Sequence, residues 1–319
     1  NLNPAPFWFL NHCLEKPEIQ RQLQLMKECG VSGFFIHPRA GLLTPYGSEA
    51  WFDTVRFIVK EAAKLDLKAW LYDEDPFPSG SAGGRIIMEH PEFAARQIVI
   101  KTVKPDSNGL FSADLGPHKL LSAVALKFGP DGSVAEKRDV SGAVGIVRDK
   151  WFASAWNSSY FSGMIDDFEF PHCRAETFYP QLRLETVLPA GEWTIYCAVA
   201  VIVQNDGKYG NSPDNLNPDC VRRFIELTHD KYAETVGEYF GSTIPGIFTD
   251  EPSCGASPPW TPSLPEEFQR EHGYPLEENL YHLNVNSGET SEKFREHYWK
   301  TVARLYKTNF FGQIAGWCK

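Results

Sequence analysis

Acidic side chains directly follow two apolar segments of the sequence. Residues 73–75 read Asp-Glu-Asp and come after the run 69–72, and residues 250–251 read Asp-Glu and come after the run 244–248. Carboxylates gathered at neighbouring strand ends repel one another, which raises the pKa of one group and prepares a protonated acid beside an ionised partner. This pattern is typical of glycoside hydrolysis, which needs two carboxyl groups in different protonation states.

Glu251 is the predicted general acid. It follows a strand that should be buried on both faces and precedes a proline that ends strand pairing, so its carboxylate is expected to emerge into a cleft. Asp250 is expected to orient this acid or to accept a sugar hydroxyl. Glu74 is the third predicted catalytic carboxylate, while its neighbours Asp73 and Asp75 are expected to bind sugar hydroxyls or to orient water.

Other residues near the predicted strand ends are candidates for substrate binding. Aromatic rings can stack on pyranose faces, and convergent polar groups fix the orientation of a ligand. The substrate-binding candidates are Trp8, Asn11, His37, Arg39, Tyr72, Asp73, Asp75 and Trp260.

Each of these residues also has an ordinary structural explanation. A strand-end carboxylate can cap a helix or lie in a solvated loop, and a tryptophan can pack in the core. The Gly-rich segment 73–84 could cradle a phosphate, but it lacks the GK[ST] signature and its acids would repel phosphate. No second histidine stands at metal-ligand spacing from His37 and no G-x-S-x-G is present, so we predict neither a metal nor a cofactor nor serine-hydrolase chemistry.

Composition excludes several classes of protein. The 319 residues include 42% hydrophobic and 13% aromatic residues, enough for a large core, and the net charge of −10 argues against a nucleic-acid partner. The longest apolar run, residues 195–203, is too short to span a bilayer. The seven cysteines are scattered without framework spacing, which favours reduced thiols and a cytoplasmic location while leaving a periplasmic or secreted one open.

Strand and helix signals alternate at both ends of the chain. Strands are expected at 7–10, 33–36, 69–72 and 244–248. Helices are expected from Pro17 to Gly30, from Ser48, from a cap at Asp219, and over 265–283 and 290–317. Continuous apolar strands separated by helices are typical of a parallel sheet that is covered on both faces.

The hydrophobic period changes near residue 98. Short strand-like segments separated by turns such as Pro-Asp-Gly at 130–132 predict a β-sandwich inserted over 98–204. The predicted domains are therefore a first barrel part at 1–97, the insert at 98–204, and a continued barrel at 205–319. Because a (β/α)8 barrel needs eight strands and about four are found, we expect a piece of a longer enzyme or an open α/β sheet.

Three sequence runs resemble a known family. "GFFIHPRAGLLTPYGSEAWF" at 33–52, "AWLYDEDPFPSGSAGG" at 69–84 and "GIFTDEPS" at 246–253 are similar to the barrel of bacterial glycoside hydrolases related to the α-L-rhamnosidases of family 106. The rhamnosidases carry a segment more like G-W-P-x-G-G in the third-strand loop, so the acidic run 73–75 departs from them. The Asp-Glu-Pro after the fourth strand also resembles the Asn-Glu of the large retaining barrel clan. That resemblance implies an acid at Glu251 and a nucleophile on a seventh strand, beyond Lys319.

The sequence as a whole predicts a glycosidase that cleaves O-glycosidic bonds of an oligosaccharide or glycoside, with a fold of (β/α)8 type. The alternative is a carbohydrate-binding protein without catalytic activity. A third class, an α/β interaction scaffold, applies if the strand-end acids are exposed caps.

Overall fold

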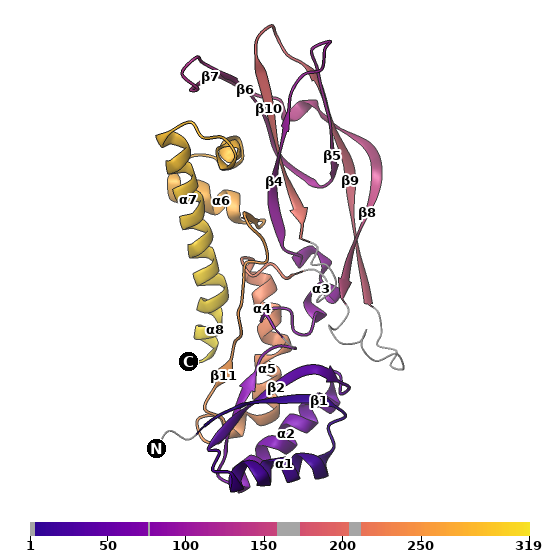
Figure 1. Cartoon of the computed structure of the whole chain (residues 1–319), viewed down its shortest axis with the longest axis vertical. Coiled ribbons are helices and arrows are strands. Elements are labelled where there is room, and N and C mark those ends of the chain that lie inside the picture. Colours follow the sequence, from indigo (N-terminus) through magenta and orange to yellow (C-terminus); the bar gives the residue numbers. More distant parts are fainter. Residues whose placement is uncertain (1–3, 76, 158–172, 204–211) are drawn as a thin grey trace.

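The computed structural model describes residues 4–75, 77–157, 173–203 and 212–319. A parallel sheet of four strands lies at one end of the molecule (Figure 1). Its order is β1 (Phe7–His12), β2 (Gly33–Leu42), β3 (Lys68–Tyr72) and β11 (Ile247–Phe248). The fourth strand is shorter than predicted, because Ile244 instead forms an isolated bridge with Phe240.

One face of this sheet is packed under helices. Alternate strand residues, including Leu10, Ile36 and Leu71, join a core with α1 (Lys16–Glu28), α2 (Glu49–Lys64) and α5 (His229–Val236). Ser48 caps α2 as expected, since its side chain accepts a hydrogen bond from the backbone N–H of Trp51 at 3.2 Å. Each fully buried aliphatic side chain of this core contributes roughly 1.5–3 kcal/mol.

The helix predicted from Asp219 is two helices. α4 (Pro218–Leu227) is capped by Asn217, whose side chain accepts from the backbone N–H of Asp219, so the predicted cap lies two residues too late. The helix axis breaks at Thr228, whose hydroxyl donates to the carbonyl of Phe224 at 2.7 Å. α5 then begins at His229, which places this histidine behind the carboxyl end of β3.

Two antiparallel sheets are formed by the segment between α3 (Arg85–Glu89) and α4, after the short 3-10 turn Pro91–Phe93, together with β12, which follows α4 in the chain. The five-stranded sheet has the order β12-β4-β10-β6-β7, and the three-stranded sheet has the order β5-β9-β8. Their inner faces share one core that includes Leu115, Leu184 and Ile195. The strands are β4 (Arg96–Val103), β5 (Leu110–Pro117), β6 (Lys119–Phe128), β7 (Val134–Asp139), β8 (Val144–Asn157), β9 (Cys173–Val187), β10 (Trp193–Ile202) and β12 (Pro259–Trp260).

No strand was predicted over Leu110–Pro117 (β5), although Phe111, Ala113 and Leu115 alternate with polar residues or glycine in this segment. The predicted insert 98–204 includes residues 158–172 and 204, which lie outside the described residues. β12 pairs with β4, so a segment assigned to the continued barrel completes the edge of the antiparallel sheet. The division into three domains stays a prediction.

The C-terminal helices join the two parts of the molecule. α6 (Leu264–His272) and α7 (Glu289–Tyr306) pack against the antiparallel sheet in a core that includes Ile98 and Ala200. A 3-10 segment (Glu277–Leu283) follows the left-handed Gly273, which interrupts the continuous helix predicted over 265–283. α7 continues through a π-helical turn (Lys307–Phe311) into α8 (Gly312–Trp317), alongside α4 and α5 in Figure 1.

The parallel sheet is open over the part of the chain that the structure describes, so the expectation of a barrel is met only as a mixed α/β fold with four parallel strands. None of the described helices has the length and apolar character needed to cross a membrane. Six cysteines are free, and the seventh, Cys173, has a side chain outside those described.

Candidate functional site

The parallel sheet has one face covered by α1, α2 and α5, and we call the opposite face, which carries Phe9, the inner face. This inner face carries the predicted polar residues. Phe9 of β1 is the register partner of His37 of β2, and Arg39 lies two residues further along the same face. Tyr72 ends β3, and its ring stacks on His37 with centroids 3.9 Å apart. The structure therefore brings His37, Arg39 and Tyr72 together at the carboxyl ends of the strands, as predicted.

His37 is buried and uncharged. The ring is 2% exposed, and its Nδ1 lies 2.6 Å from the carbonyl oxygen of Pro38. Burial lowers the pKa of His37, while the Pro38 carbonyl opposes that shift. Because Nδ1–H donates to this carbonyl, the neutral ring keeps Nε2 as a hydrogen-bond acceptor.

Asp250 is anchored to β3 and to the Gly-rich loop. The hydroxyl of Tyr72 donates to its Oδ2 at 2.5 Å, a charge-assisted hydrogen bond. The backbone N–H of Asp250 donates to Ser79 Oγ at 2.8 Å, and the N–H of Ser79 donates to the Asp250 carbonyl at 2.8 Å. Burial and the Asp250 carboxylate raise the pKa of Tyr72 well above its usual range, so Tyr72 stays a donor.

Asp73 is buried and connects the Gly-rich loop to the end of β11 by hydrogen bonds. Its Oδ1 accepts from the Ser79 hydroxyl at 2.6 Å and its Oδ2 accepts from the Thr249 hydroxyl at 2.7 Å. His229 Nε2 lies 3.7 Å from Oδ2. Burial raises the pKa of Asp73 to about 7, against the effect of its two hydroxyl donors. With 0% exposure the group has no access to substrate, which is contrary to its predicted role in sugar binding.

Glu74 is enclosed by the loop that follows it. Its Oε2 accepts from three backbone N–H groups, those of Gly80, Ser81 and Ala82, at 2.7–3.0 Å. Its Oε1 accepts from the N–H groups of Asp75 and Gly83 at 2.9 and 2.5 Å. Burial raises the pKa of Glu74, and the backbone N–H groups of Gly83, Asp75, Ser81 and Ala82 oppose that shift. At 1% exposure both oxygens are occupied, so the placement does not support the predicted catalytic role.

The glycines at the end of this loop explain how one carboxylate collects so many amides. Gly83 and Gly84 adopt left-handed backbone angles of φ 65° and 82°, and Ala82 does so at φ 52°. Consecutive backbone N–H groups in a turn of this kind point toward a common centre and form an anion-binding nest. Here the anion belongs to the chain itself, since Glu74 fills the nest.

Asp75 differs from its two neighbours because its side chain is partly exposed. Its Oδ1 is buried and has no hydrogen-bond partner among the described residues. Burial first and the Glu74 charge second raise the pKa of Asp75 to about 7. Asp75 therefore keeps its predicted place as a group that could meet a sugar hydroxyl.

Glu251 is exposed and has an unusual backbone. Its φ of 44° lies in the left-handed region, which costs a non-glycine residue roughly 1–3 kcal/mol and is frequent at functional sites. Among the described residues its carboxylate has no hydrogen-bond or ion-pair partner. The turn thus presents Glu251 to solvent directly beside the anchored Asp250.

Arg39 lies between two aromatic rings. Its guanidinium carbon is 4.9 Å from the ring centroid of Phe9 and 5.2 Å from that of Phe77, which comes from the Gly-rich loop. Cation–π contacts on both sides fix the guanidinium at the mouth of the site. Phe9 itself is 50% exposed.

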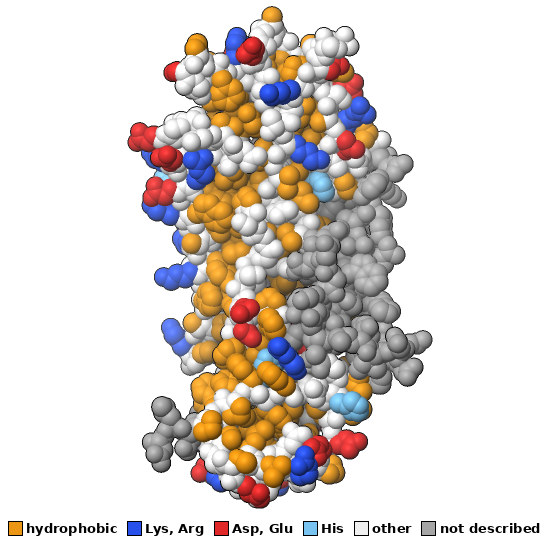
Figure 2. All heavy atoms as spheres, viewed as in Figure 1, with side chains coloured by type: hydrophobic (Ala, Val, Ile, Leu, Met, Phe, Trp, Pro, Cys, Tyr) orange, Lys and Arg blue, Asp and Glu red, His pale blue; other side chains and the backbone are white. Residues whose placement is uncertain are grey.

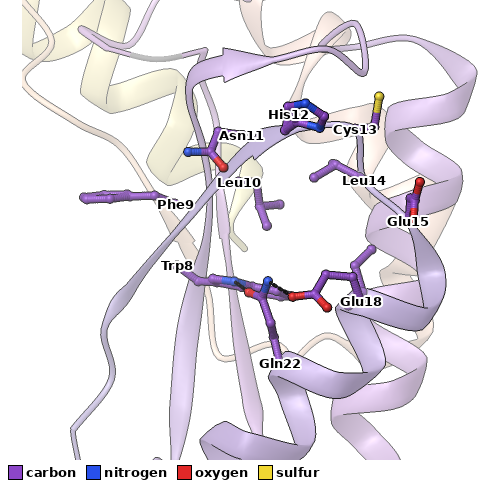
Figure 3. Close-up of a pocket in the computed structure, with 11 residues that line it drawn as sticks. Trp8, Phe9, Leu10, Asn11, His12, Cys13, Leu14, Glu15, Glu18 and Gln22 are labelled. Carbon is purple, nitrogen blue, oxygen red and sulfur yellow. Dashed lines mark hydrogen bonds between the residues drawn. The ribbon is translucent and has the colours of Figure 1, made fainter.

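Two predicted sugar-stacking tryptophans lie elsewhere, and those predictions are wrong. Trp8 points to the opposite side of β1 from Phe9, where its Nε1 donates to Gln22 of α1 at 2.7 Å (Figure 3). It is 8% exposed and packs edge-to-face on Phe34. Trp260 is 3% exposed in the core that joins β12 to α6. Trp8 is the second residue of β1, far from the carboxyl end of this strand, and strand alternation turns its ring to the face covered by α1.

Asn11 is exposed near the end of β1, beside a pocket of about 400 Å³ between this strand and α1. Of the predicted site residues, only Trp8 and Asn11 line this pocket. The acids of the β3 and β11 turns are not part of it, although Phe9, which contacts Arg39 on the inner face, also lines the pocket.

Sequence reasoning missed several residues that organise the site. Ser79 and Thr249 hold Asp73, His229 faces it from α5, and Phe9 and Phe77 hold Arg39. The alternation of β1 could have identified Phe9, which shares a face with Asn11. Within the described part of the chain, no group of three or more His, Cys, Asp or Glu side chains is arranged to hold a metal.

Comparison with known proteins connects this geometry to a family. Residues 184–319 match the model of glycoside hydrolase family 106, described as α-L-rhamnosidase. A protein of Formosa agariphila provisionally named as a β-glucuronidase is 22% identical over 96% of this chain. The resemblance inferred from the sequence is confirmed over residues 184–319, which are similar to the glycoside hydrolases of family 106.

The fold has a similar solved structure. The rhamnosidase from Novosphingobium sp. PP1Y matches with a TM-score of 0.56 and 16% identity over 99% of this chain. The chain spans 27% of the length of the Formosa protein and 45% of the solved rhamnosidase chain.

Proposed function

We propose that the protein acts as a glycoside hydrolase, with its site at the carboxyl ends of β1, β2, β3 and β11. The observation that carries this proposal is the pairing of an anchored and an open carboxylate at one turn. Asp250 is held by Tyr72, and Glu251 projects beside it from a left-handed residue. The relationship to family 106 supports the same class of reaction.

In the proposed mechanism Glu251 is the general acid. Its carboxyl donates a proton to the leaving oxygen as the bond from this oxygen to the anomeric carbon breaks. A water oxygen forms the new bond to this carbon, either directly, with the water proton passing to a second carboxylate, or after that carboxylate has first formed a glycosyl ester. One carboxylate oxygen of Asp250 accepts a hydrogen bond from a sugar hydroxyl, while the other oxygen accepts from the Tyr72 hydroxyl. His37 Nε2 and the Asp75 carboxylate accept hydrogen bonds from further sugar hydroxyls. Glu74 acts indirectly, because it holds the loop that carries Ser79 and Phe77.

We further propose that the parallel sheet is part of a (β/α)8 barrel. Its inner face exposes Phe7 by 42% and Phe9 by 50%, whereas the outer face is buried under helices. Figure 2 shows hydrophobic side chains gathered over the part of the molecule where Figure 1 draws β1, β2 and β11. Further strands packed on this face would bury it and could supply the second carboxylate of the reaction.

The test is turnover by the full-length protein on a panel of nitrophenyl glycosides that covers both anomers. The proposal expects release of nitrophenol from at least one substrate and its loss in Glu251→Gln. Binding of sugars without hydrolysis of any panel member would instead identify a carbohydrate-binding protein without catalytic activity.

A further inference from the structure

Arg39 has no anionic partner among the described residues. Every other arginine whose side chain the structure describes donates to a carboxylate, a hydroxyl or a carbonyl. The guanidinium of Arg39 instead contacts the faces of Phe9 and Phe77. Its five N–H donors are therefore free of any acceptor in the described part of the chain, although the plane that carries them is fixed.

The ends of the other strands in this sheet carry acidic residues. Asp250 and Glu251 follow β11, and Asp75 follows β3, within a chain of net charge −10. An anionic ligand would be repelled from this end of the sheet unless a cation received it. Arg39 stands on β2 two residues beyond His37, roughly 6–7 Å further along the strand, and the charges of both Arg39 and Asp250 act on His37.

We propose that Arg39 binds the carboxylate of a uronic acid residue, so that the substrates of this site are glycosides of carboxylated sugars. This inference rests on the proposed hydrolase function. A guanidinium forms a planar fork that matches a carboxylate with two parallel hydrogen bonds, a geometry that neutral sugar hydroxyls do not offer. The two rings hold the fork in place, so little side-chain entropy is lost on binding.

The two named relatives differ on this point. A rhamnoside is a neutral deoxysugar and a glucuronide carries a carboxylate at C5, so the sugar cannot be carried over from their names. Arg39 favours the carboxylated class on the residues of this chain alone. The carboxylate would lie at Arg39 while the anomeric carbon faces Asp250 and Glu251.

The experiment compares glucuronides with glucosides, which differ only at C6, and adds a rhamnoside as a second neutral sugar. For the full-length enzyme, kcat/KM is measured on 4-nitrophenyl D-glucuronides and D-glucosides of both anomers, and on the α-L-rhamnoside. The proposal expects a preference for a glucuronide, and a loss of roughly 10- to 100-fold on that substrate in Arg39→Met. The same variant should change turnover of the neutral glycosides by less than about threefold.

Two variants serve as controls. Arg39→Lys keeps the charge but loses the fork, and should retain only part of the preference. Arg56→Met removes an arginine of α2, which is paired with Asp53 on the covered side of the sheet. It should leave kcat/KM unchanged for both the glucuronide and the neutral glycosides. Preference for the neutral sugars, or equal losses on glucuronide and glucoside in Arg39→Met, would overturn the inference while leaving the hydrolase function intact.

Binding measurements separate the proposed carboxylate recognition by Arg39 from the proposed hydrolase function. Titration of the full-length protein with D-glucuronate, D-glucose and D-glucose 6-phosphate should show Arg39-dependent binding of glucuronate alone. If glucuronate binds in this way but no glycoside is cleaved, Arg39 recognises carboxylated sugars and the hydrolase proposal fails. If glucuronate does not bind, or glucose 6-phosphate binds as well or better, the assignment to a carboxylate is wrong.

Discussion

The turn after β3 and the turn after β11 have the same kind of sequence and different chemistry. Both place adjacent acids at the carboxyl end of a parallel strand. After β3, Asp73 and Glu74 are 0% and 1% exposed, and their oxygens are occupied by hydroxyls and backbone amides. After β11, Asp250 keeps one anchored oxygen and Glu251 is open to solvent.

The difference teaches that the donors around a carboxylate, rather than its place at a strand end, decide its role. Glycines at 80, 83 and 84 let the backbone close around Glu74, so this acid builds the loop. The β11 turn has no such run of glycines directly after it, and its backbone is held by Ser79 from the other turn. One acidic turn therefore positions the other.

The largest effect on stability is expected for Glu74→Gln. Whichever oxygen becomes an amide nitrogen, at least two backbone N–H groups lose their acceptor, at about 1–3 kcal/mol each. The free energy of unfolding should fall by roughly 2–6 kcal/mol in denaturant titrations. The matched Glu251→Gln should leave it almost unchanged, and similar losses in both variants would remove the distinction between the two turns.

A smaller effect is expected for Tyr72→Phe, which removes the hydrogen bond to Asp250 and keeps the ring stacked on His37. Hydrogen bonds to charged groups contribute about 1.5–3 kcal/mol. Turnover of the best glycoside substrate should therefore fall roughly 10- to 100-fold, with little change in the stability of the β3 turn. An unchanged kcat/KM would mean that the orientation of Asp250 does not matter.

Asp73 and His229 form a buried pair behind the β3 turn. Replacing each of them should change the pH dependence of folding stability in opposite directions. Burial raises the pKa of Asp73 to about 7 and lowers that of His229 to about 4. Folded Asp73 binds a proton that the unfolded chain lacks, which adds stability as the pH falls from 7 to 4. Neutral folded His229 lacks a proton that the unfolded chain binds, which removes stability as the pH falls from 6.5 to 4.

In the wild type these two contributions oppose each other. Relative to the wild type, His229→Gln should gain stability as the pH falls from 6.5 to 4, and Asp73→Asn should lose stability as the pH falls from 7 to 4. Each slope reaches at most about 1.4 kcal/mol per pH unit. Denaturant midpoints measured across this range give the sign, and parallel slopes in the two variants would rule out the assigned protonation states.

The sequence predicted the elements well and the orientation of side chains poorly. Apolar runs located β1, β2 and β3, and the Ser48 cap located α2, because these signals are local. Trp8 and Trp260 were misplaced because alternation and burial depend on which face meets a helix or sheet far along the chain. The cage around Glu74 was not predicted, since it arises from amides six to nine residues downstream that converge only in the folded loop.

The central claim is that Glu251, on the open turn, is the proton donor. Its most direct test is the turnover of Glu251→Gln in the full-length enzyme on two aryl glycosides of one sugar, one with a poor leaving group and one with an activated leaving group. We predict a loss of about 10²–10⁴ on the first and a much smaller loss on the second, which needs no protonation. Equal losses on both substrates, or no loss on either, would contradict the assignment of Glu251 as the acid.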